Sequence, residues 1–110
     1  MVPTTEHRRY PRLRVSCPIT LTDEEGQKIF TKTIDLSDGG ALVEVPATGA
    51  PAEGTVLGVE LQVPALVTAT GQKQSLVCQA RVVRRQSDGH AARLRIALEF
   101  LKPLNLGLHG

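Results

Sequence analysis

The stretch RLRIALEF, residues 93–100, carries the clearest structural pattern in the sequence. Its apolar residues fall on every second position, at Leu94, Ile96, Leu98 and Phe100. Successive side chains of a β-strand point to opposite faces, so this period of two directs these four side chains toward a core and the charged ones toward solvent. The stretch therefore predicts a half-buried β-strand.

Upstream of this strand the same alternation recurs. Asp88-Gly89 is a strong hairpin signal, which makes residues 74–86 the antiparallel neighbour of 93–100. Six strands joined by short turns, with no helical period, predict an antiparallel sandwich or small barrel. We expect an all-β, six-stranded antiparallel β-barrel, because closure removes exposed strand edges. The other expected strands are 15–22, 27–34, 41–45 and 55–63, with loops at 46–54 and 64–73 and a short strand allowed at 66–68.

Length and composition predict a single domain with an aliphatic core. The chain has 110 residues, of which 41% are apolar and only 3% aromatic. Pro3 and Pro11 disfavour helix near the N-terminus. We therefore expect a flexible basic N-terminal arm at 1–14, the barrel at 15–101, and a tail at 102–110 with little or no helix.

Several classes of function are disfavoured by the residues present. Cys17 and Cys78 sit in strand patterns and are expected to be buried free thiols, and neither the cysteines nor the histidines have zinc-ligand spacing. No set of nucleophile, base and orienting residue and no pair of carboxylates suggests an enzyme. An apolar leader and a membrane-spanning run are also lacking, so the cytoplasm is the expected location.

Charge is distributed unevenly along the chain. Residues 33–72 hold five acids and no Lys or Arg, whereas residues 1–32 hold six bases and residues 73–110 hold seven. Basic ends around an acidic middle suit an anionic ligand gripped by the terminal segments, although such charge runs are also typical of solvated faces.

Two short stretches could form a site for a guanine nucleotide. Arg8-Arg9-Tyr10-Pro11-Arg12 offers three guanidinium groups, which bind phosphates and guanine edges through paired hydrogen bonds. Asp35-Leu36-Ser37-Asp38-Gly39-Gly40 offers a carboxylate that can accept from guanine N–H groups, and glycines that allow close backbone approach. Taken singly, the first is typical of a basic tail and the second of an ordinary turn.

Together these stretches resemble the PilZ domain, a bacterial receptor module for cyclic di-GMP. The resemblance rests on Arg8-x-x-x-Arg12, on Asp35-x-Ser37-x-x-Gly40 and on the closing Ala97-Leu98-Glu99-Phe100, and it covers roughly residues 6–101. It implies a PilZ-like barrel whose N-terminal arm wraps over it when the ligand binds. It also implies no cofactor, with cyclic di-GMP as the ligand and an unknown downstream protein as the partner.

The resemblance also implies a role for each matching residue. Arg8 and Arg12 would clamp phosphates and the Hoogsteen edges of the guanines, and Arg9 would reinforce the cluster. Asp35 would accept from the Watson–Crick edge of a guanine. Ser37 would donate to a phosphate or base, while Gly39 and Gly40 would let the turn lie against the ligand.

The sequence departs from the family pattern at three places. Arg84 stands near a position where relatives often carry an aromatic residue, and it is expected to stack on a base or bind a phosphate. The usual C-terminal helix is missing or short. His7 precedes Arg8 where some relatives have another arginine, which leaves open whether one ligand or an intercalated pair binds.

Other interpretations remain at this stage. One is a degenerate PilZ-like adaptor that binds only protein. Another is a basic nucleic-acid-binding barrel, using the arm and an outward stripe formed by Arg81, Arg85, Arg93 and Arg95. The scarcity of aromatic residues disfavours base stacking, so no DNA partner is expected. The sequence leaves the oligomeric state open between monomer and dimer.

Overall fold

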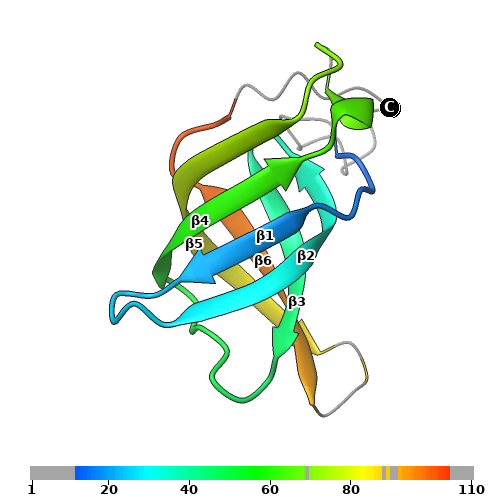
Figure 1. The fold of residues 1–110 in the computed structure, drawn as a ribbon. Coiled ribbons are helices and arrows are strands. Elements are labelled where there is room, and N and C mark those ends of the chain that lie inside the picture. Colours follow the sequence, from blue (N-terminus) through cyan, green and yellow to red (C-terminus); the bar gives the residue numbers. More distant parts are fainter. Residues whose placement is uncertain (1–11, 69, 88, 90–91, 105–110) are drawn as a thin grey trace, which may run out of the picture.

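The computed structural model describes residues 12–68, 70–87, 89 and 92–104. This part of the chain forms six strands and one turn of 3₁₀ helix (Figure 1). In chain order these are β1 (Pro18–Thr22), β2 (Lys28–Ser37), β3 (Gly40–Pro46), β4 (Val56–Val63), η2 (Ala65–Val67), β5 (Gln74–Ser87) and β6 (Arg93–Phe100).

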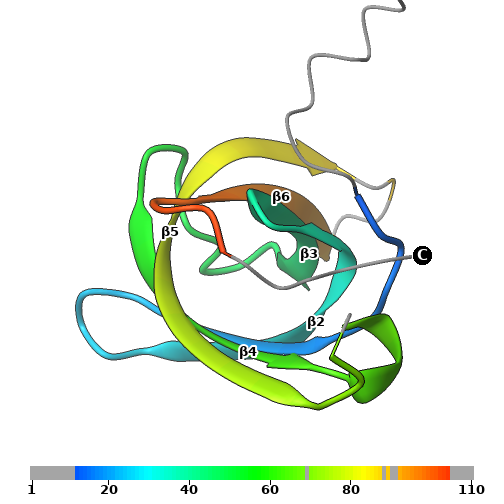
Figure 2. The same ribbon diagram turned by 90° about the horizontal axis from the view of Figure 1, so that it is seen from above.

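The strands form a closed antiparallel barrel in the order β1-β2-β3-β6-β5-β4. Pairing of β1 with β4, as in Ile19 opposite Leu61, closes the ring, which Figure 2 shows from above. The all-β, six-stranded antiparallel barrel expected from the sequence is thereby confirmed. Each of the six described strands has a neighbour on both sides, although β2 pairs with β3 only from Thr33 onward and β5 pairs with β4 only up to Arg81.

The core consists of the inward-facing positions of all six strands. On β6 the residues Ile96, Leu98 and Phe100 are buried, as their alternation predicts, while Leu94 is half-buried. Phe100 is the aromatic member of an otherwise aliphatic core. The buried apolar side chains are Cys17, Ile19, Leu21, Leu36, Ala41, Val43, Val45, Leu57, Val59, Leu61, Val63, Ala80, Val82, Ile96, Leu98 and Phe100.

The first strand begins at Pro18, three residues later than the sequence pattern suggested. The preceding residues are attached to β2 by the side chain of Thr33 together with single backbone bonds, such as Thr33 N to Cys17 O at 2.9 Å, instead of a regular ladder. Thr33 Oγ1 accepts from Cys17 N at 2.8 Å and donates to Val15 O. The hydroxyl thus satisfies backbone groups inside the barrel, where an unpaired polar group would be costly.

The short strand allowed at residues 66–68 is replaced by η2. Pro64 precedes it in extended geometry, and Val67 N donates to Pro64 O at 3.2 Å. Thr68, which is buried, donates from its hydroxyl to Gln72 O at 2.9 Å and so closes the loop. Local side-chain bonding of this kind competes with strand pairing, which explains the difference.

Candidate functional site

The start of the described chain lies against the end of β2. Leu13 and Leu36 exchange two backbone hydrogen bonds, with N···O distances of 2.8 and 2.9 Å. Beside them, Arg12 Nη1 lies 3.8 Å from Asp35 Oδ2. Arg12, the last arginine of the cluster, therefore meets Asp35 in the fold, and Asp35 lies within β2 although the sequence pattern ended this strand at residue 34. The side chains of Arg12 and Asp35 are 39% and 17% exposed, so a ligand can reach both.

Asp35 faces outward because β2 contains a bulge. Thr33 pairs with Val43 and Asp35 pairs with Leu42, which leaves Ile34 as an extra residue. Thr33 is buried, so strict alternation would turn Asp35 into the core. The extra residue returns the carboxylate to the outer face, which is a common use of bulges beside functional sites.

A second bulge in β5 does the same for Arg84. Val82 is buried opposite Leu98, and the next pair is Arg84 with Ala97, leaving Val83 as the extra residue. Without the bulge, Arg84 would take an inward position. With it, the guanidinium lies on the outer surface of the barrel.

This second bulge also corrects an expectation about the basic stripe. Alternation along β5 placed Arg85 outward together with Arg81. The observed register pairs Arg85 with Ile96, whose side chain points into the barrel, although Arg85 itself is exposed near the end of β5. Because of the bulge, Arg84 and not Arg85 occupies the position on the outer face.

The two bulges align their residues across four strands. Asp35 pairs with Leu42, Leu42 with Ala97, and Ala97 with Arg84, and we call these four residues the outer row. Neighbouring strands lie about 4.8 Å apart, so three steps separate the backbones at Asp35 and Arg84 by roughly 14 Å. Leu42 and Ala97 are half-buried, and they provide an apolar stretch between a carboxylate and a guanidinium.

Ser37 holds the hairpin between β2 and β3. Its Oγ accepts from Gly39 N at 3.1 Å and from Gly40 N at 3.2 Å, and its side chain is almost fully buried. A serine that bonds its own turn in this way fixes the turn geometry. The predicted donation from Ser37 to a ligand stays a prediction.

Gly40 is needed where β3 passes β6. A Cβ at this position would lie 2.1 Å from the carbonyl oxygen of Leu98, a distance that no side chain can tolerate. Its φ lies outside the left-handed region, so close strand packing, and not turn conformation, requires glycine here. The predicted contacts of Gly39 and Gly40 with a ligand are likewise untested.

The C-terminal residues of the described chain are bonded to the same hairpin. Phe100 N donates to Gly39 O at 2.9 Å, and Leu104 N donates to Asp38 O at 2.7 Å. In the view from above, this segment passes over the end of the barrel beside β3 (Figure 2). The hairpin is therefore held by hydrogen bonds from both its own serine and the C-terminal segment.

This arrangement can bind a ligand that combines flat polar bases with phosphates. A carboxylate accepts from guanine N–H groups, and guanidinium groups bind phosphates or guanine edges in paired fashion. In the described residues, no group of three or more His, Cys, Asp or Glu gathers to hold a metal ion. None of the helical segments described is long and apolar enough to cross a membrane.

The predicted site residues divide into three groups. Arg12, Asp35, Ser37, Gly39 and Gly40 lie together around the end of β2. Arg84 lies across the barrel wall at the far end of the outer row. Arg8 and Arg9 fall outside the described residues.

Leu42 and Ala97, which lie between Asp35 and Arg84 in the outer row, are not among the site residues predicted from the sequence. A signal was present: Thr33-Ile34 and Val82-Val83 each interrupt strict alternation just before a charged residue. Such an interruption is what a bulge produces.

Comparison with known proteins places this geometry in a family context. The family model described as the PilZ domain matches residues 6–108 of this chain. A search of curated proteins found no match.

Solved structures share the fold. Bacillus subtilis inhibitor of motility (MotI/DgrA) superposes with a TM-score of 0.74 at 20% identity, over 94% of this chain and 49% of that one. Escherichia coli YcgR in complex with c-di-GMP gives a TM-score of 0.63 at 18% identity, over 86% and 38%. The PilZ domain of YcgR with c-di-GMP gives 0.62 at 17%, over 86% and 78%. The chain thus spans about half or less of the length of the first two proteins.

Proposed function

Because this chain belongs to the PilZ domain family, we propose that it is a receptor for cyclic di-GMP. The observation that carries this proposal is the meeting of Arg12 with Asp35 at 3.8 Å, on the outer face of the barrel. A cationic group and a carboxylate side by side provide phosphate binding and guanine recognition within one small area. Solved relatives whose structures contain c-di-GMP support the same ligand.

The ligand replaces the contact between Arg12 and Asp35. Asp35 turns its oxygens to the N–H groups of a guanine Watson–Crick edge, and Arg12 turns to a phosphate or to a Hoogsteen edge. Arg8 and Arg9 add further guanidinium groups from the same N-terminal arm. An ion pair at 3.8 Å with solvent access is weak, so its loss costs little compared with the charge-assisted bonds gained.

Arg84 extends the proposed site along the outer row. Cyclic di-GMP carries two guanines, and a ligand anchored at Asp35 can lie over Leu42 and Ala97 toward Arg84. Flat base faces gain from contact with the half-buried apolar side chains, while the guanidinium stacks on a base or binds a phosphate. The bulge in β5 is what makes Arg84 available for this role.

Binding also orders the N-terminal arm, in this proposal. Four arginines, Arg8, Arg9, Arg12 and Arg14, lie within seven positions and repel one another. A dianionic ligand neutralises this repulsion and repays the entropy lost on ordering. The ordered arm then presents a new surface to a downstream protein.

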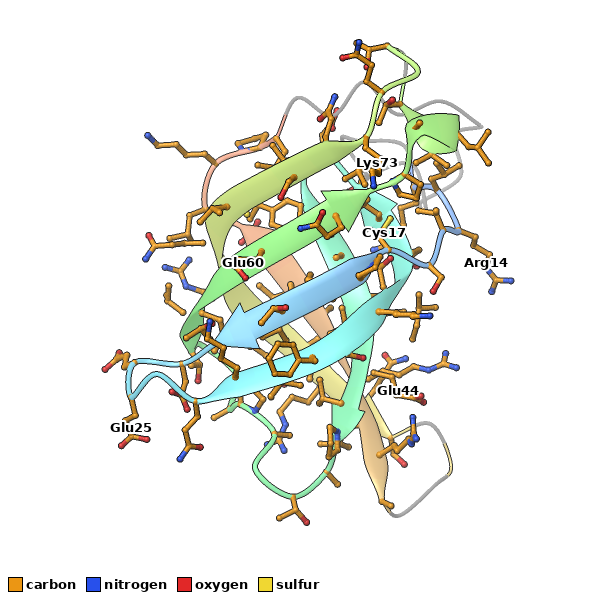
Figure 3. All side chains as sticks on the ribbon, viewed as in Figure 1. Arg14, Cys17, Glu25, Glu44, Glu60 and Lys73 are labelled. Carbon is orange, nitrogen blue, oxygen red and sulfur yellow. The ribbon has the colours of Figure 1, made fainter. Side chains whose placement is uncertain are left out.

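Calorimetric titration with cyclic di-GMP tests the proposal through two matched pairs of variants. Arg12→Ala removes the guanidinium beside Asp35, whereas Arg14→Ala removes one that is exposed and points away from the barrel (Figure 3). We expect Arg12→Ala to weaken binding about tenfold to a hundredfold, because each such contact contributes roughly 1–3 kcal/mol. Arg14→Ala should stay within about threefold of the wild type.

The second pair compares neighbouring arginines on β5. Arg84→Ala should weaken binding by about tenfold, whereas Arg85→Ala should leave it nearly unchanged, since Arg85 does not belong to the outer row. Equal effects of the two would remove Arg84 from the site. No heat with the wild-type protein would contradict the receptor proposal as a whole.

A further inference from the structure

A second surface of the barrel is apolar and basic at once. Phe30, on the outer face of β2, is 75% exposed, although Phe100 is buried. Among the described residues, Phe30 is the one aromatic side chain left in solvent. Lys28 and Lys32 precede and follow it by two positions, and all three are exposed. We call these three residues the lysine–phenylalanine stripe.

On one side of the stripe, β1 carries no charge on its outer face. On the other side, Thr31 Oγ1 donates to Glu44 O at 2.7 Å, and the Glu44 carboxylate is paired with Arg93. In β1, Thr22 pairs with Lys28, Thr20 with Phe30 and Pro18 with Lys32. These small side chains leave one flank of the phenyl ring open. In the described residues, no carboxylate forms an ion pair with either lysine.

We propose that the lysine–phenylalanine stripe docks an acidic helical segment of a partner protein. Two residues of a strand span about 7 Å, so the Cα atoms of Lys28 and Lys32 each lie about that far from the Cα of Phe30 along β2. Four residues of a helix span about 6 Å. A helix lying along β2 with one apolar residue, and carboxylates four positions before and after it, therefore matches all three side chains.

The pairing of β2 bears on the kind of docking. Each of the six described strands has two neighbours, although residues 28–32 are laddered only to β1, because the pairing of β2 with β3 begins at Thr33. The proposed partner helix binds through side chains laid on the outer face and not by adding a strand. An exposed aromatic side chain flanked by cations is suited to this, because aromatic anchors dominate interface energies and the flanking charges select the partner.

The surrounding charges favour a protein over a nucleic acid. Along the same row, Thr20 is followed by Glu60 on β4 and then by Val77 on β5, which is 80% exposed. Figure 3 shows Glu60 on the outer surface of β4 and Glu25 in the turn that leads into β2. These carboxylates limit the proposed partner to a short acidic segment over the two lysines, since a long polyanion would also meet Glu60 and Glu25. A single exposed ring also offers only one base a stacking partner.

The stripe is separate from the proposed cyclic di-GMP site. Both lie on β2, but the bulge at Ile34 stands between Lys32 and Asp35. The inference does not depend on the ligand proposal. A protein that does not bind cyclic di-GMP could still dock a partner here.

The test uses the 110-residue chain, labelled with ¹⁵N, and three stapled helical peptides. The first peptide has Leu with Glu four positions before and after it; the second has Lys in place of both Glu; the third has Ser in place of Leu. We expect only the first to bind with a Kd below about 1 mM, and its largest amide shifts to fall on residues 28–32. Raised salt should weaken it several-fold.

Variants of the protein complete the test. Phe30→Ser, and separately Lys28→Glu with Lys32→Glu, should weaken the first peptide at least tenfold. Val77→Ser, which removes an equally exposed apolar side chain on β5, should have no effect. Each substituted residue is exposed in the folded state. An amide spectrum of Phe30→Ser that is unchanged away from residue 30 would exclude an indirect effect of unfolding.

Three results would overturn the inference. One is equal binding of the Glu and Lys peptides, and another is unchanged binding by Phe30→Ser. The third is that oligothymidylate or vesicles with anionic lipid shift residues 28–32 while none of the peptides does. Each of these leaves the receptor proposal unaffected.

Discussion

At the scale of single residues, Gly40 serves packing as well as the motif that contains it. A Cβ there would meet the Leu98 carbonyl at 2.1 Å, whereas a Cβ at Gly58 would meet Thr22 at an ordinary 3.7 Å. We expect Gly40→Ala to lower the free energy of unfolding by about 1–3 kcal/mol or more, as overpacking does. Gly58→Ala should be neutral or slightly stabilising.

Urea unfolding of both variants checks this expectation. A Gly40→Ala protein as stable as the wild type would show that β3 and β6 separate without cost. In that case, a loss of ligand binding by Gly40→Ala would mean that Gly40 contacts the ligand directly. If stability falls, a binding defect at Gly40 alone says little about the ligand.

Cys17 gives the barrel a residue-scale dependence on pH. Burial raises the pKa of its thiol above the ordinary value of 9.0, and a hydrogen bond with the Thr33 side chain opposes this only in part. Above pH 9 the thiol of the unfolded chain ionises while the folded one stays protonated. The free energy of unfolding therefore falls as pH rises from about 9, and levels off once the pH exceeds the folded pKa.

The comparison that isolates this effect is Cys17→Ala against wild type, unfolded in urea at pH 8 and at pH 10. Wild type should lose more stability over this interval than the variant, by at most about 1.4 kcal/mol per pH unit. Equal losses would mean that Cys17 ionises alike in both states.

At the scale of elements, the bridge between Leu13 and Leu36 attaches the end of the N-terminal arm to the barrel. Leu13→Pro removes the N–H that donates to Leu36 O at 2.8 Å, whereas Leu13→Ala keeps it. We expect Leu13→Pro to weaken cyclic di-GMP at least tenfold by releasing Arg12 from Asp35, while Leu13→Ala has a smaller effect. Calorimetry measures the affinity, and circular dichroism confirms that the β-barrel remains. Equal affinities of Leu13→Pro and the wild type for cyclic di-GMP would mean that the bridge between Leu13 and Leu36 is not needed for binding.

The elements were predictable to different degrees. Residues 93–100 match β6 in full, because a period of two within one strand needs no partner to be interpreted. The bulges at Ile34 and Val83 were not predicted, because a bulge depends on which residue of the neighbouring strand is paired. The late start of β1 was not predicted for a similar reason. The Thr33 hydroxyl can replace ladder bonds only when β2 lies beside the residues before β1.

At the scale of the whole molecule, closure into a barrel is what brings residues of the two motifs together in the candidate site. From sequence alone, Arg12 and Asp35 were separate signals with ordinary explanations. Strand order made their meeting an expectation, and the 3.8 Å contact confirms that they meet. The contribution of Arg84 required the complete register β2-β3-β6-β5, which sequence alone does not provide.

The same closure gives the molecule two faces for which we propose functions. The outer row lies on β2, β3, β6 and β5, and the lysine–phenylalanine stripe lies on β2 beside β1. β2 takes part in both faces, and its bulge marks the boundary between them. A ligand signal and a partner contact could therefore share one strand without competing for the same side chains.

Amide shift mapping by NMR during titration with cyclic di-GMP would show where on the barrel the ligand lies. We predict that the largest shifts fall on Arg12 and Leu13, on Asp35, and along the outer row to Arg84, with residues 28–32 little changed. Shifts concentrated away from the outer row, or no shifts at saturating ligand, would contradict this prediction.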